Sequence, residues 1–412
     1  MADVTIAILG TLDTKEQELS FLAERIESAG ASTVLIDCGV MTDPVKRPEI
    51  TSNEVARRGG SSLETLREAH DRGEAVRVMA EGARDTLLEL AESGRVHGAI
   101  AAGGSGNTWI AAHAMQALPV GFPKLIVSTM ASGDVSPYVG ISDITMMYSV
   151  GDIEGLNRLT TLVLNNAAGA IVGMAGMTKP AIETRPTIAI TMFGVTTPAV
   201  KAVRSLLEAR TSFEVLVFHA TGTGGRAMEN LVSQGIVEGV IDLTTTELAD
   251  EVVGGVLSAG PERLKAAVER NVPQVIAPGA LDMVNFGPRD TVPARFSDRT
   301  FHVHNPQVTL MRTTPDENRR IAELMATNLA GADPALVTIV VPKEGVSMID
   351  KPGAPFHDAS ADEAFRDTLR ERLAGRLPMV EVDAHINDEA FAAVVVERFL
   401  DNWERHSQSA RG

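Results

Sequence analysis

Short apolar runs rich in β-branched residues alternate along the chain with segments in which apolar residues recur every three or four positions. Nearly continuous apolar runs of this length are typical of strands that are covered on both faces, as in parallel sheets. The helical periods between them indicate βαβ units. We therefore expect strands at residues 4–9, 33–37, 99–102, 125–128, 145–150, 187–191, 214–218, 237–243, 274–277 and 337–341.

The strand–helix pattern is interrupted between Lys179 and Pro186, and it restarts at Thr187. A chain of 412 residues also exceeds the usual size of one hydrophobic core. We therefore predict an α/β fold of two Rossmann-like domains with mainly parallel sheets, residues 1–183 and 184–412. Ligands of open α/β sheets bind at the carboxyl ends of strands, so we expect the ligand in a crevice between the domains.

Several segments depart from this pattern. Residues 39–53, 278–300 and 342–361 lack clear periodicity, and structureless segments of this length are often lids or site loops. The apolar residues 162–177 are too few to span a bilayer, and we expect a buried helix that runs into a strand. A last helix is predicted over residues 388–406.

A glycine-rich stretch at residues 98–109, GAIAAGGSGNTW, joins an expected strand to an expected helix. Such a turn exposes backbone N–H groups at the positive end of the helix, which suits an anion such as phosphate. Ser105, Asn107 and Thr108 could add side-chain hydrogen bonds. The spacing is neither a Walker A loop nor the full dinucleotide fingerprint, so tight strand–helix packing is an equal alternative for this loop alone.

Three more polar loops rich in glycine or threonine follow expected strands, at residues 10–15, 193–198 and 218–226. Four such loops at the carboxyl ends of strands favour a ligand site over packing. The predicted ligand-binding residues are Gly10, Thr11, Asp13, Thr14, Gly103, Gly104, Ser105, Gly106, Asn107, Thr108, Thr196, Thr221, Gly222, Thr223, Gly224 and Gly225.

Three charged residues are candidates for catalysis. Lys15 could neutralise a phosphate or a carboxylate, or it could be a solvated lysine at a helix start. Arg312 could hold such an anion through two parallel hydrogen bonds, or it could form a surface ion pair. Asp134 could supply a carboxylate to the crevice. Asp13, in the first polar loop, could bind Mg²⁺ or cap the helix.

His302 and His304 lie on one face of an expected strand. Alternating histidines can ligate a metal, and His219, Asp282 or His357 could be a third ligand. Nothing in the spacing requires this, so we predict no metal centre here and interpret the histidines as hydrogen-bonding groups near a site.

Composition narrows the class of partner. The net charge of −17 disfavours nucleic acid, because binding a phosphate backbone needs a basic face. Cys38 is the only cysteine, so no disulfide forms within the chain, and the N-terminus has no positive n-region. We therefore expect a cytoplasmic protein with a small-molecule ligand and no membrane partner. We also expect a homo-oligomer, on general grounds.

Eight stretches together resemble one known family, the Tm-1-like ATP-binding proteins, which are otherwise uncharacterised in bacteria and fungi. They run from near the N-terminus to about residue 360 and read ILGTLDTKEQELSFL, AAGGSGNT, VSTMASGDVSPYVG, MFGVTTPAV, HATGTGGRAME, APGALDMVNFGP, HNPQVTLMRTT and VPKEGVSMIDKPGAPFHD. The resemblance implies two Rossmann-like subdomains and ATP binding, and ATP implies Mg²⁺. The stretch GGSGNT is also similar to the GG-D-GT loop of phosphofructokinase-like and NAD kinases. Ser105 replaces the acid of that loop, which puts a metal or base role there in doubt.

Three functions follow as hypotheses. The first is an ATP-binding protein that acts as an enzyme on a small organic acid or a phosphorylated metabolite, by phosphoryl transfer or ligase-type chemistry. The second is a non-enzymatic, nucleotide-dependent protein-binding module, since the plant member of the family captures a viral replication protein. The third is a metal-assisted lyase or hydrolase that uses His302 and His304 on a small carboxylate.

Overall fold

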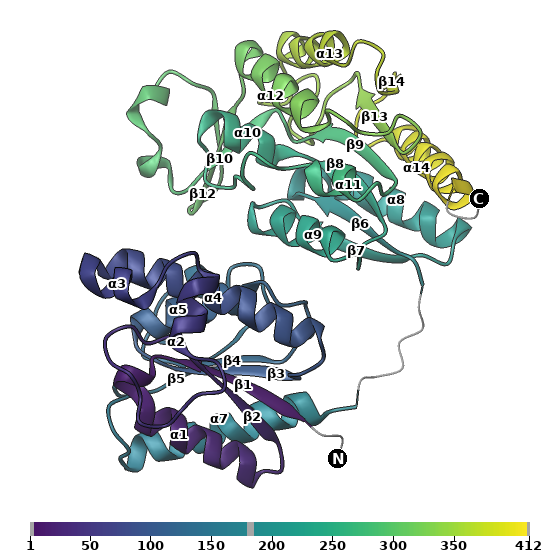
Figure 1. Cartoon of the computed structure of the whole chain (residues 1–412). Coiled ribbons are helices and arrows are strands. Elements are labelled where there is room, and N and C mark those ends of the chain that lie inside the picture. The colour runs from purple at the N-terminus through teal and green to yellow at the C-terminus, as the bar shows by residue number, and fades with distance from the viewer. Residues whose placement is uncertain (1–3, 179–184, 410–412) are drawn as a thin grey trace. The chain divides into compact units, whose positions relative to one another are not determined.

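The computed structural model describes residues 4–178 and 185–409. The chain divides into two compact units, unit 1 (Met1–Ala181) and unit 2 (Ile182–Gly412). The predicted domain boundary at residue 183 lies outside the described residues. Each unit is an α/β layer structure around its own parallel sheet, so the predicted fold class is confirmed (Figure 1).

Unit 1 is built on a five-stranded sheet of order β2-β1-β3-β4-β5, in which every neighbouring pair is parallel. The continuous apolar runs predicted these five strands to within a few residues, because the inner strands are buried on both faces. The strands are β1 (Thr5–Gly10), β2 (Ser32–Asp37), β3 (Gly98–Gly103), β4 (Lys124–Ser128) and β5 (Thr145–Tyr148).

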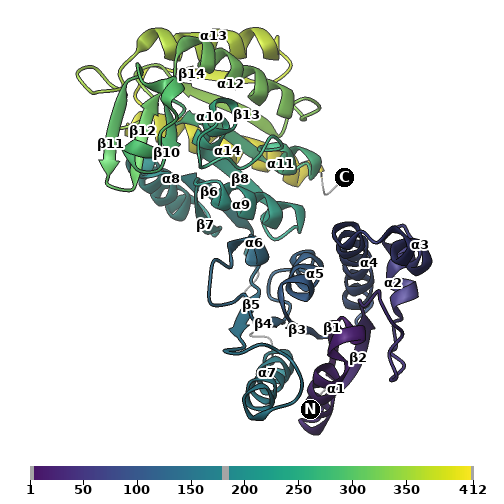
Figure 2. The ribbon, with the colours of Figure 1, turned by 90° about the vertical axis from the view of Figure 1, so that its left-hand side faces the viewer.

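Helices cover both faces of this sheet (Figure 2). Ile6 and Ile8 of β1 pack with α1 (Leu12–Ser28) and α7 (Arg158–Gly176) on one face. Ala7 and Leu9 point to the other face, because successive side chains of a strand alternate. The helices of that face are α2 (Ser52–Arg58), α3 (Leu63–Ala69), α4 (Arg72–Glu92) and α5 (Ser105–Gln116), and the short α6 (Ser136–Val139) follows β4.

Helix α7 differs from the prediction for residues 162–177. It is one helix that ends at Gly176, and the strand expected after it is absent from the described residues up to Thr178. It is also only partly buried, since Leu159, Leu162 and Met174 are exposed. By length and composition alone α7 could cross a membrane, which is weak evidence because core helices pass the same test. Here α7 packs along α1.

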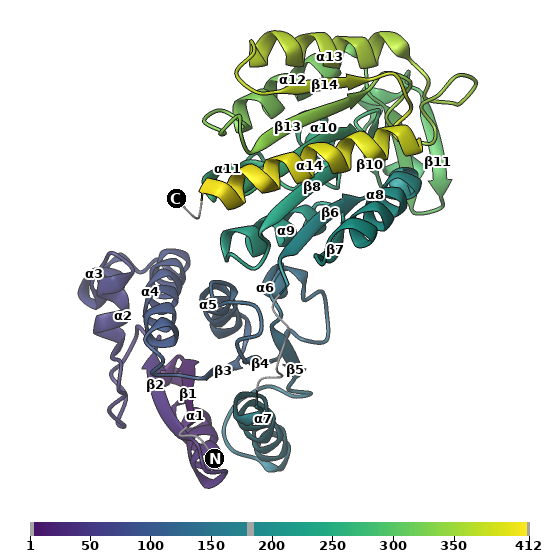
Figure 3. The same cartoon turned by 90° about the vertical axis from the view of Figure 1, so that its right-hand side faces the viewer.

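Unit 2 is built on a six-stranded parallel sheet of order β14-β13-β9-β8-β6-β7 (Figure 3). Five of these strands match predicted runs, whereas β14 was missed. The strands are β6 (Thr187–Met192), β7 (Glu214–His219), β8 (Gly239–Thr244), β9 (Gln274–Gly279), β13 (Val337–Pro342) and β14 (Met379–Val382).

One face of this sheet packs against α8 (Thr197–Arg210) and α14 (Glu389–Ser409), the latter close to the predicted last helix. The short 3-10 helix η1 (Gly194–Thr196) leads into α8. The other face carries α9 (Thr223–Ser233), α10 (Thr246–Val253), α11 (Lys265–Glu269), α12 (Pro315–Asn328) and α13 (Ala359–Leu373).

A small antiparallel sheet interrupts the predicted loop at residues 278–300, so that prediction was wrong in part. Its order is β10-β12-β11, with bounds β10 (Met283–Phe286), β11 (Phe301–Asn305) and β12 (Val308–Arg312). Two 3-10 turns, η2 (Arg289–Thr291) and η3 (Ala294–Phe296), lie between β10 and β11. By contrast, no helix or strand lies between the end of β13 and the start of α13, in agreement with the loop predicted at 342–361.

Candidate functional site

A cavity of about 700 Å³ opens at the carboxyl ends of β1 and β3 in unit 1, and we call it the unit 1 pocket. In the order 2-1-3-4-5 this is where the chain changes direction across the sheet, which is the expected ligand position of an open α/β fold. Two of the four predicted loops meet there. Thr11, Asp13, Thr14 and Lys15 line the pocket after β1, and Gly104, Ser105, Gly106 and Asn107 line it after β3.

The loop after β3 leaves the start of α5 uncovered. Helix α5 begins at Ser105, and its N-cap residue Gly104 supplies no side-chain hydrogen bond. The first amides of a helix have no partner within the helix, and those of Ser105, Gly106 and Asn107 donate no hydrogen bond within the described parts of the chain. These amides therefore offer free donors to an anion at the positive end of the helix.

The positions of Gly104 and Gly106, at the start of α5, also have open space beside them. A Cβ atom built on Gly104 would lie 3.9 Å from its nearest neighbour, Thr129 Oγ1. One built on Gly106 would lie 3.7 Å from Arg72 Nη2. Packing inside the protein therefore does not require glycine at either position, whereas a Cβ on Gly103 would lie 2.8 Å from that of Asn107.

Asn107 and Thr108 turn inward from this loop. Asn107 Nδ2 donates to the carbonyl oxygen of Ala102 at 2.9 Å, while its Oδ1 is buried without a hydrogen-bond donor. Thr108 is fully buried, and its hydroxyl bonds Gly104 O and Ser128 Oγ. Thr108 thus fixes the loop, while Asn107 adds an unpaired acceptor beside the pocket.

Three cationic side chains line the pocket, and one of them, Arg67, is paired with Asp43 at 3.0 Å. Lys15 breaks the helical geometry of α1, with φ −129° and ψ 23°, and its Nζ lies 4.0 Å from the buried carboxylate of Glu18. Arg72 reaches Gly106 from the start of α4 and forms no hydrogen bond or ion pair with any described residue. Arg72 was not predicted from the sequence, because it lies at the start of a separate helix, far from any glycine loop in sequence.

Much of the remaining pocket wall is apolar and was also missed, although Arg67, His70, Asp71 and Asp152 line it as well. Leu66 comes from α3, Val76 and Met79 from α4, and Ile110 from α5, while Cys38 follows β2. Their sequence positions show only the ordinary helical period of core residues. The pocket therefore combines a cationic end at the start of α5 with an apolar wall.

The loop after β1 is partly structural. Asp13 Oδ2 accepts hydrogen bonds from the amides of Val40 and Met41, at 3.0 and 2.9 Å, so Asp13 holds the segment after β2 and does not cap α1. The hydroxyls of Thr11 and Thr14 bond each other at 2.9 Å. Gly10 does not line the pocket, and a Cβ there would lie 2.2 Å from Leu19 Cδ1, so its role is packing.

The second glycine loop, after β7, is already filled by a carboxylate of the protein. The amides of Gly222 and Gly225 donate to Glu247 Oε1, at 2.7 and 3.1 Å. A Cβ on Gly224 would lie 1.8 Å from the carbonyl oxygen of His219, and Gly222 has a φ of +81°. Two of the amides predicted to receive a phosphate therefore have an internal partner, and the glycines are explained by packing and conformation.

Thr196, Thr221 and Thr223 are not gathered around a cavity either. Thr196 is fully buried, and its hydroxyl bonds that of Thr244 at 2.8 Å. The hydroxyl of Thr221 bonds His219 O at 3.2 Å, and Thr223 is exposed at the start of α9. The carboxyl ends of β6 and β8, where the sheet order of unit 2 reverses, are thus occupied by its own side chains.

Glu247 belongs to a buried network around Arg263. Arg263 Nε donates to Glu247 Oε2 at 2.7 Å, and Nη2 donates to Asp242 Oδ1 at 2.7 Å. Glu229 lies beside the same guanidinium, and burial raises the pKa of this carboxyl to about 7. One arginine thus balances three carboxyl groups beneath the second glycine loop.

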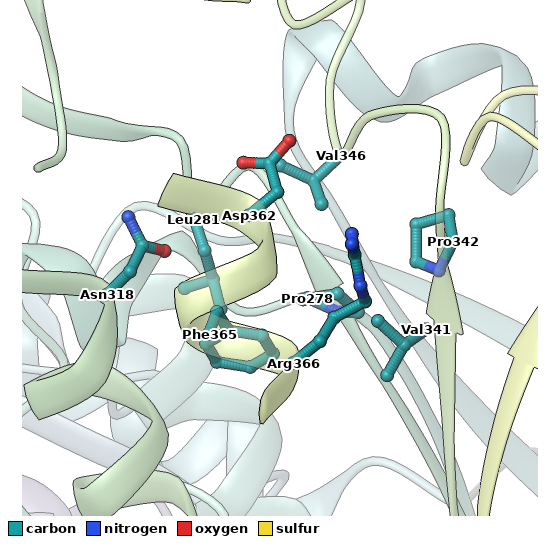
Figure 4. Close-up of a pocket in the computed structure, with 9 residues that line it drawn as sticks. All are labelled: Pro278, Leu281, Asn318, Val341, Pro342, Val346, Asp362, Phe365 and Arg366. Carbon is teal, nitrogen blue, oxygen red and sulfur yellow. The ribbon is translucent and has the colours of Figure 1, made fainter. Parts of the chain in front are cut away.

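Arg312, predicted to be exposed to an anion, is buried in unit 2 with protein partners. Its Nε donates to Phe356 O at 2.7 Å, Nη1 to Thr313 Oγ1 at 2.9 Å and Nη2 to Asp362 Oδ1 at 2.8 Å. The nearby cavity in Figure 4, bounded by Asp362, Phe365 and Arg366 of α13 and the ends of β9 and β13, is about 10 Å³. That is about the space of one water, so no ligand fits there.

Asp134 is exposed and does not line the unit 1 pocket. One of its carboxylate oxygens accepts from the amide of Ser136 at 2.9 Å, and hydrogen bonding by the side chain and the amide of Ser136 lowers the pKa of Asp134. His302 packs against Phe356, whereas His304 is exposed. Across residues 4–178 and 185–409, no three or more His, Cys, Asp or Glu side chains are grouped to hold a metal.

Three carboxyl groups share Arg312. Burial raises the pKa of Asp282 to about 6 and that of Asp362 to about 7, and it also raises the pKa of Asp350. Asp282 Oδ1 and Asp350 Oδ1 are buried without a hydrogen-bond partner. With one cation for three buried acids, unit 2 retains protons in this cluster that an unfolded chain would release.

Known proteins match both units. Residues 4–180 match the "Uncharacterised protein family (UPF0261) N-terminal domain", and residues 185–403 match its C-terminal domain. A UPF0261 protein of Clostridium tetani is 49% identical over 404 residues, which cover 97% of this chain and 99% of that protein. The ToMV resistance protein Tm-1(GCR237) of Solanum lycopersicum is 40% identical over 417 residues, which cover 95% of this chain but 55% of the tomato protein.

Solved structures add little to this. A UDP-N-acetylglucosamine 2-epimerase from Rickettsia bellii aligns with 66% of this chain and 78% of its own, at 9% identity and a TM-score of 0.23. That similarity is too low to carry an argument about function.

Replacing Glu247 by alanine should destabilise unit 2, because it leaves Arg263 and two glycine amides with unpaired buried donors. We expect the free energy of unfolding to fall by about 3–5 kcal/mol, measured by urea denaturation. Glu247→Gln, which keeps an acceptor oxygen, should lose less. The exposed Glu262→Ala is the control, and an equally small effect of Glu247→Ala would contradict the role assigned to Glu247.

The stability of unit 2 should fall as the pH rises. The folded pKa values of Asp282 and Asp362 lie above the ordinary value, so the folded state holds protons that the unfolded chain releases from about pH 4 upward. We expect the free energy of unfolding to decrease up to about pH 7, by about 1.4 kcal/mol per pH unit for each proton retained.

Trp403 reports on unit 2 by its fluorescence once Trp109, the other tryptophan of the chain, is replaced by phenylalanine. Urea titrations of that variant at about pH 5.5 and about pH 8, which bracket these pKa values, measure the slope. Adding Asp362→Asn should flatten it, and an unchanged slope would show that this carboxyl does not retain a proton.

Proposed function

The chain belongs to the uncharacterised protein family UPF0261, and we propose that it binds ATP, with Mg²⁺, in the unit 1 pocket. The observation that carries this proposal is the uncapped start of α5, whose free amides face the pocket beneath the unpaired guanidinium of Arg72. Free amides and an unpaired cation at one point of a pocket favour a polyanion.

The dimensions of the pocket suit a nucleotide. Its volume of about 700 Å³ lies within the usual range for small-molecule sites. The triphosphate would lie on the amides of Ser105 and Gly106, with Arg72 and Lys15 neutralising its charge. The adenosine would lie against the apolar wall that Leu66, Met79 and Ile110 help to form. This arrangement needs residues of unit 1 alone.

The two glycine loops would then have different roles. The loop at Gly103–Thr108 would bind phosphate, whereas the loop at Gly222–Gly225 has its own internal carboxylate, Glu247. Of the three residues expected to act in catalysis, Lys15 lines the pocket, while Asp134 and Arg312 have structural partners. The substrate of an ATP-dependent reaction would therefore be handled by other residues than those two.

A nucleotide-dependent binding module is a second candidate, and one observation favours it. From Leu159 to Thr178, helix α7 and the residues after it carry no charged side chain, yet Leu159, Leu162, Met174 and Met177 are exposed. An exposed apolar face of this kind is typical of surfaces that contact another protein.

Gly106→Val should abolish most ATP binding without unfolding unit 1, because the space that its side chain fills is open in the protein. We expect the Kd measured by calorimetry to rise by about 10- to 100-fold, since a hydrogen bond to a charged group contributes ~1.5–3 kcal/mol. Gly169→Val on α7, another open position, is the matched control. Absence of heat when wild-type protein is titrated with millimolar ATP and Mg²⁺ would end the proposal.

Arg72→Ala should weaken ATP binding but spare adenosine, because Arg72 is assigned to the phosphates. Arg77→Ala is the control, since Arg77 lies on the same helix, outside the pocket lining, and is exposed. Calorimetric Kd values for ATP and adenosine with each variant separate the two effects. If Arg72→Ala weakened the binding of ATP and of adenosine by the same factor, Arg72 would not act on the phosphates.

A further inference from the structure

The loop between β5 and α7, residues 149–157, brings an unexpected carboxylate to the unit 1 pocket. Strand β5 lies at the edge of the sheet, three strands from β1, yet Asp152 lines the pocket with Lys15 and Gly104. The loop is anchored at α1, where Glu18 Oε1 accepts from the amide of Gly155 at 2.7 Å. Ile153, next to Asp152, is buried in the core that α1 shares with the sheet.

The same loop contains a strained residue. Val150 has a φ of +66° and is 59% exposed. A positive φ is a true outlier for a β-branched residue, and glycine would adopt it without strain. Ser149 fixes the turn on either side of Val150, through its hydroxyl to Gly151 O at 2.7 Å and its amide to Ser128 O at 3.2 Å.

Because the Val150 side chain is exposed, packing in the core does not explain why a valine occupies this strained position. Backbone strain of this kind persists where the surrounding structure imposes it, often beside a functional group. The group that this turn positions is Asp152, two residues further on.

Asp152 is an exposed residue that lines the pocket, and one oxygen of its carboxylate is free to bind a ligand there. Its Oδ1 accepts from the amide of Ile153 at 2.8 Å, and its Oδ2 has no hydrogen bond or ion pair with a described residue. Asp13 and Asp71 each use one carboxylate oxygen to hold other backbone, the amides of Val40 and Met41 and the start of α4, whereas the engaged oxygen of Asp152 accepts only from the next residue's amide. The Lys15 ammonium lies beside Glu18 instead of Asp152.

A free carboxylate beside a triphosphate would repel it unless a cation lay between them. Mg²⁺ fits this need, because it takes oxygen ligands, keeps several waters, and is commonly held by one or two carboxylates together with substrate phosphates. The remaining ligands of such a site would be phosphate and water oxygens.

We propose that Asp152 is the protein ligand of the Mg²⁺ ion that accompanies the nucleotide, and that the strained turn at Val150 holds it in place. This inference rests on the proposed function, because the ion needs the phosphates of the nucleotide for its other ligands. The phosphates would then be bound on one side by the amides of α5 and Arg72, and on the other side by the Mg²⁺ ion held by Asp152.

The test measures how far Mg²⁺ changes ATP affinity. ATP is titrated calorimetrically into wild-type protein and Asp152→Asn, each with saturating MgCl₂ and with EDTA in its place. For the wild type we expect Mg²⁺ to tighten ATP binding by about tenfold or more, which is the size of effect usually seen when a group that supports a metal site is changed. For Asp152→Asn we expect little effect of Mg²⁺, and binding in EDTA that equals or exceeds that of the wild type, because the repelling charge is gone.

Asp134→Asn is the matched control, since Asp134 is an exposed aspartate of the same unit that does not line the pocket. It should retain the wild-type response to Mg²⁺. Val150→Gly provides a second variant that keeps the carboxylate. Val150→Gly should unfold at a higher temperature than the wild type, because the backbone strain is relieved. Its ATP affinity should depend less on Mg²⁺ than that of the wild type, because the turn no longer holds Asp152 in place.

The outcomes separate this inference from the proposed function. If the wild type binds no ATP in either buffer, the proposed function fails. If it binds ATP but Asp152→Asn retains the full effect of Mg²⁺, or if Mg²⁺ has no effect on the wild type, ATP binding stands and the role of Asp152 is wrong. Unchanged Mg²⁺ dependence in Val150→Gly would overturn the role of the strained turn alone.

Discussion

The first backbone amides of a helix have no acceptor within the helix. The two units differ in whether a carboxylate of the protein fills this position or a pocket leaves it open. Both units place a glycine turn between a strand and a helix. In unit 2 the carboxylate of Glu247 accepts from Gly222 and Gly225. In unit 1 no described side chain reaches the amides at the start of α5, and the space beside them is a pocket.

Because Glu247 is a buried charge, unit 2 needs further charged groups around it. A buried carboxylate must itself be balanced, which explains why Arg263 lies against it and why Asp242 and Glu229 share that guanidinium. A second cluster, around Arg312, follows the same rule with three aspartates. Both clusters hold more acids than cations, so protons complete the balance. Unit 2 thus fills its glycine loop with a buried carboxylate of its own, where unit 1 has an open cavity.

The sequence predicted most of the parallel sheets, because strands buried on both faces appear as continuous apolar runs. It missed β10, β12 and β14; β10 and β14 are only four residues long and contain Asn285 and Glu381, respectively, and β12 is a strand of the small antiparallel sheet. The two loops of the pocket were also predictable, since glycine and threonine after a strand mark a turn.

Other parts of the site depend on contacts between distant segments. Glu247 follows its glycines by more than 20 residues, and Arg72 precedes Gly106 by 34, so no local pattern connects them. Asp152 reaches the pocket only because its loop returns from an edge strand to α1. Such placements follow from the path of the chain and not from residue type.

The uncharged face of α7 has a consequence for how copies of this protein would interact. A net charge of −17 makes copies repel one another, and this repulsion weakens as ions shorten the Debye length to about 8 Å at physiological salt. Contact between apolar side chains involves no charge to be screened. Any association through α7 would therefore strengthen as ionic strength rises, whereas association through ion pairs would weaken.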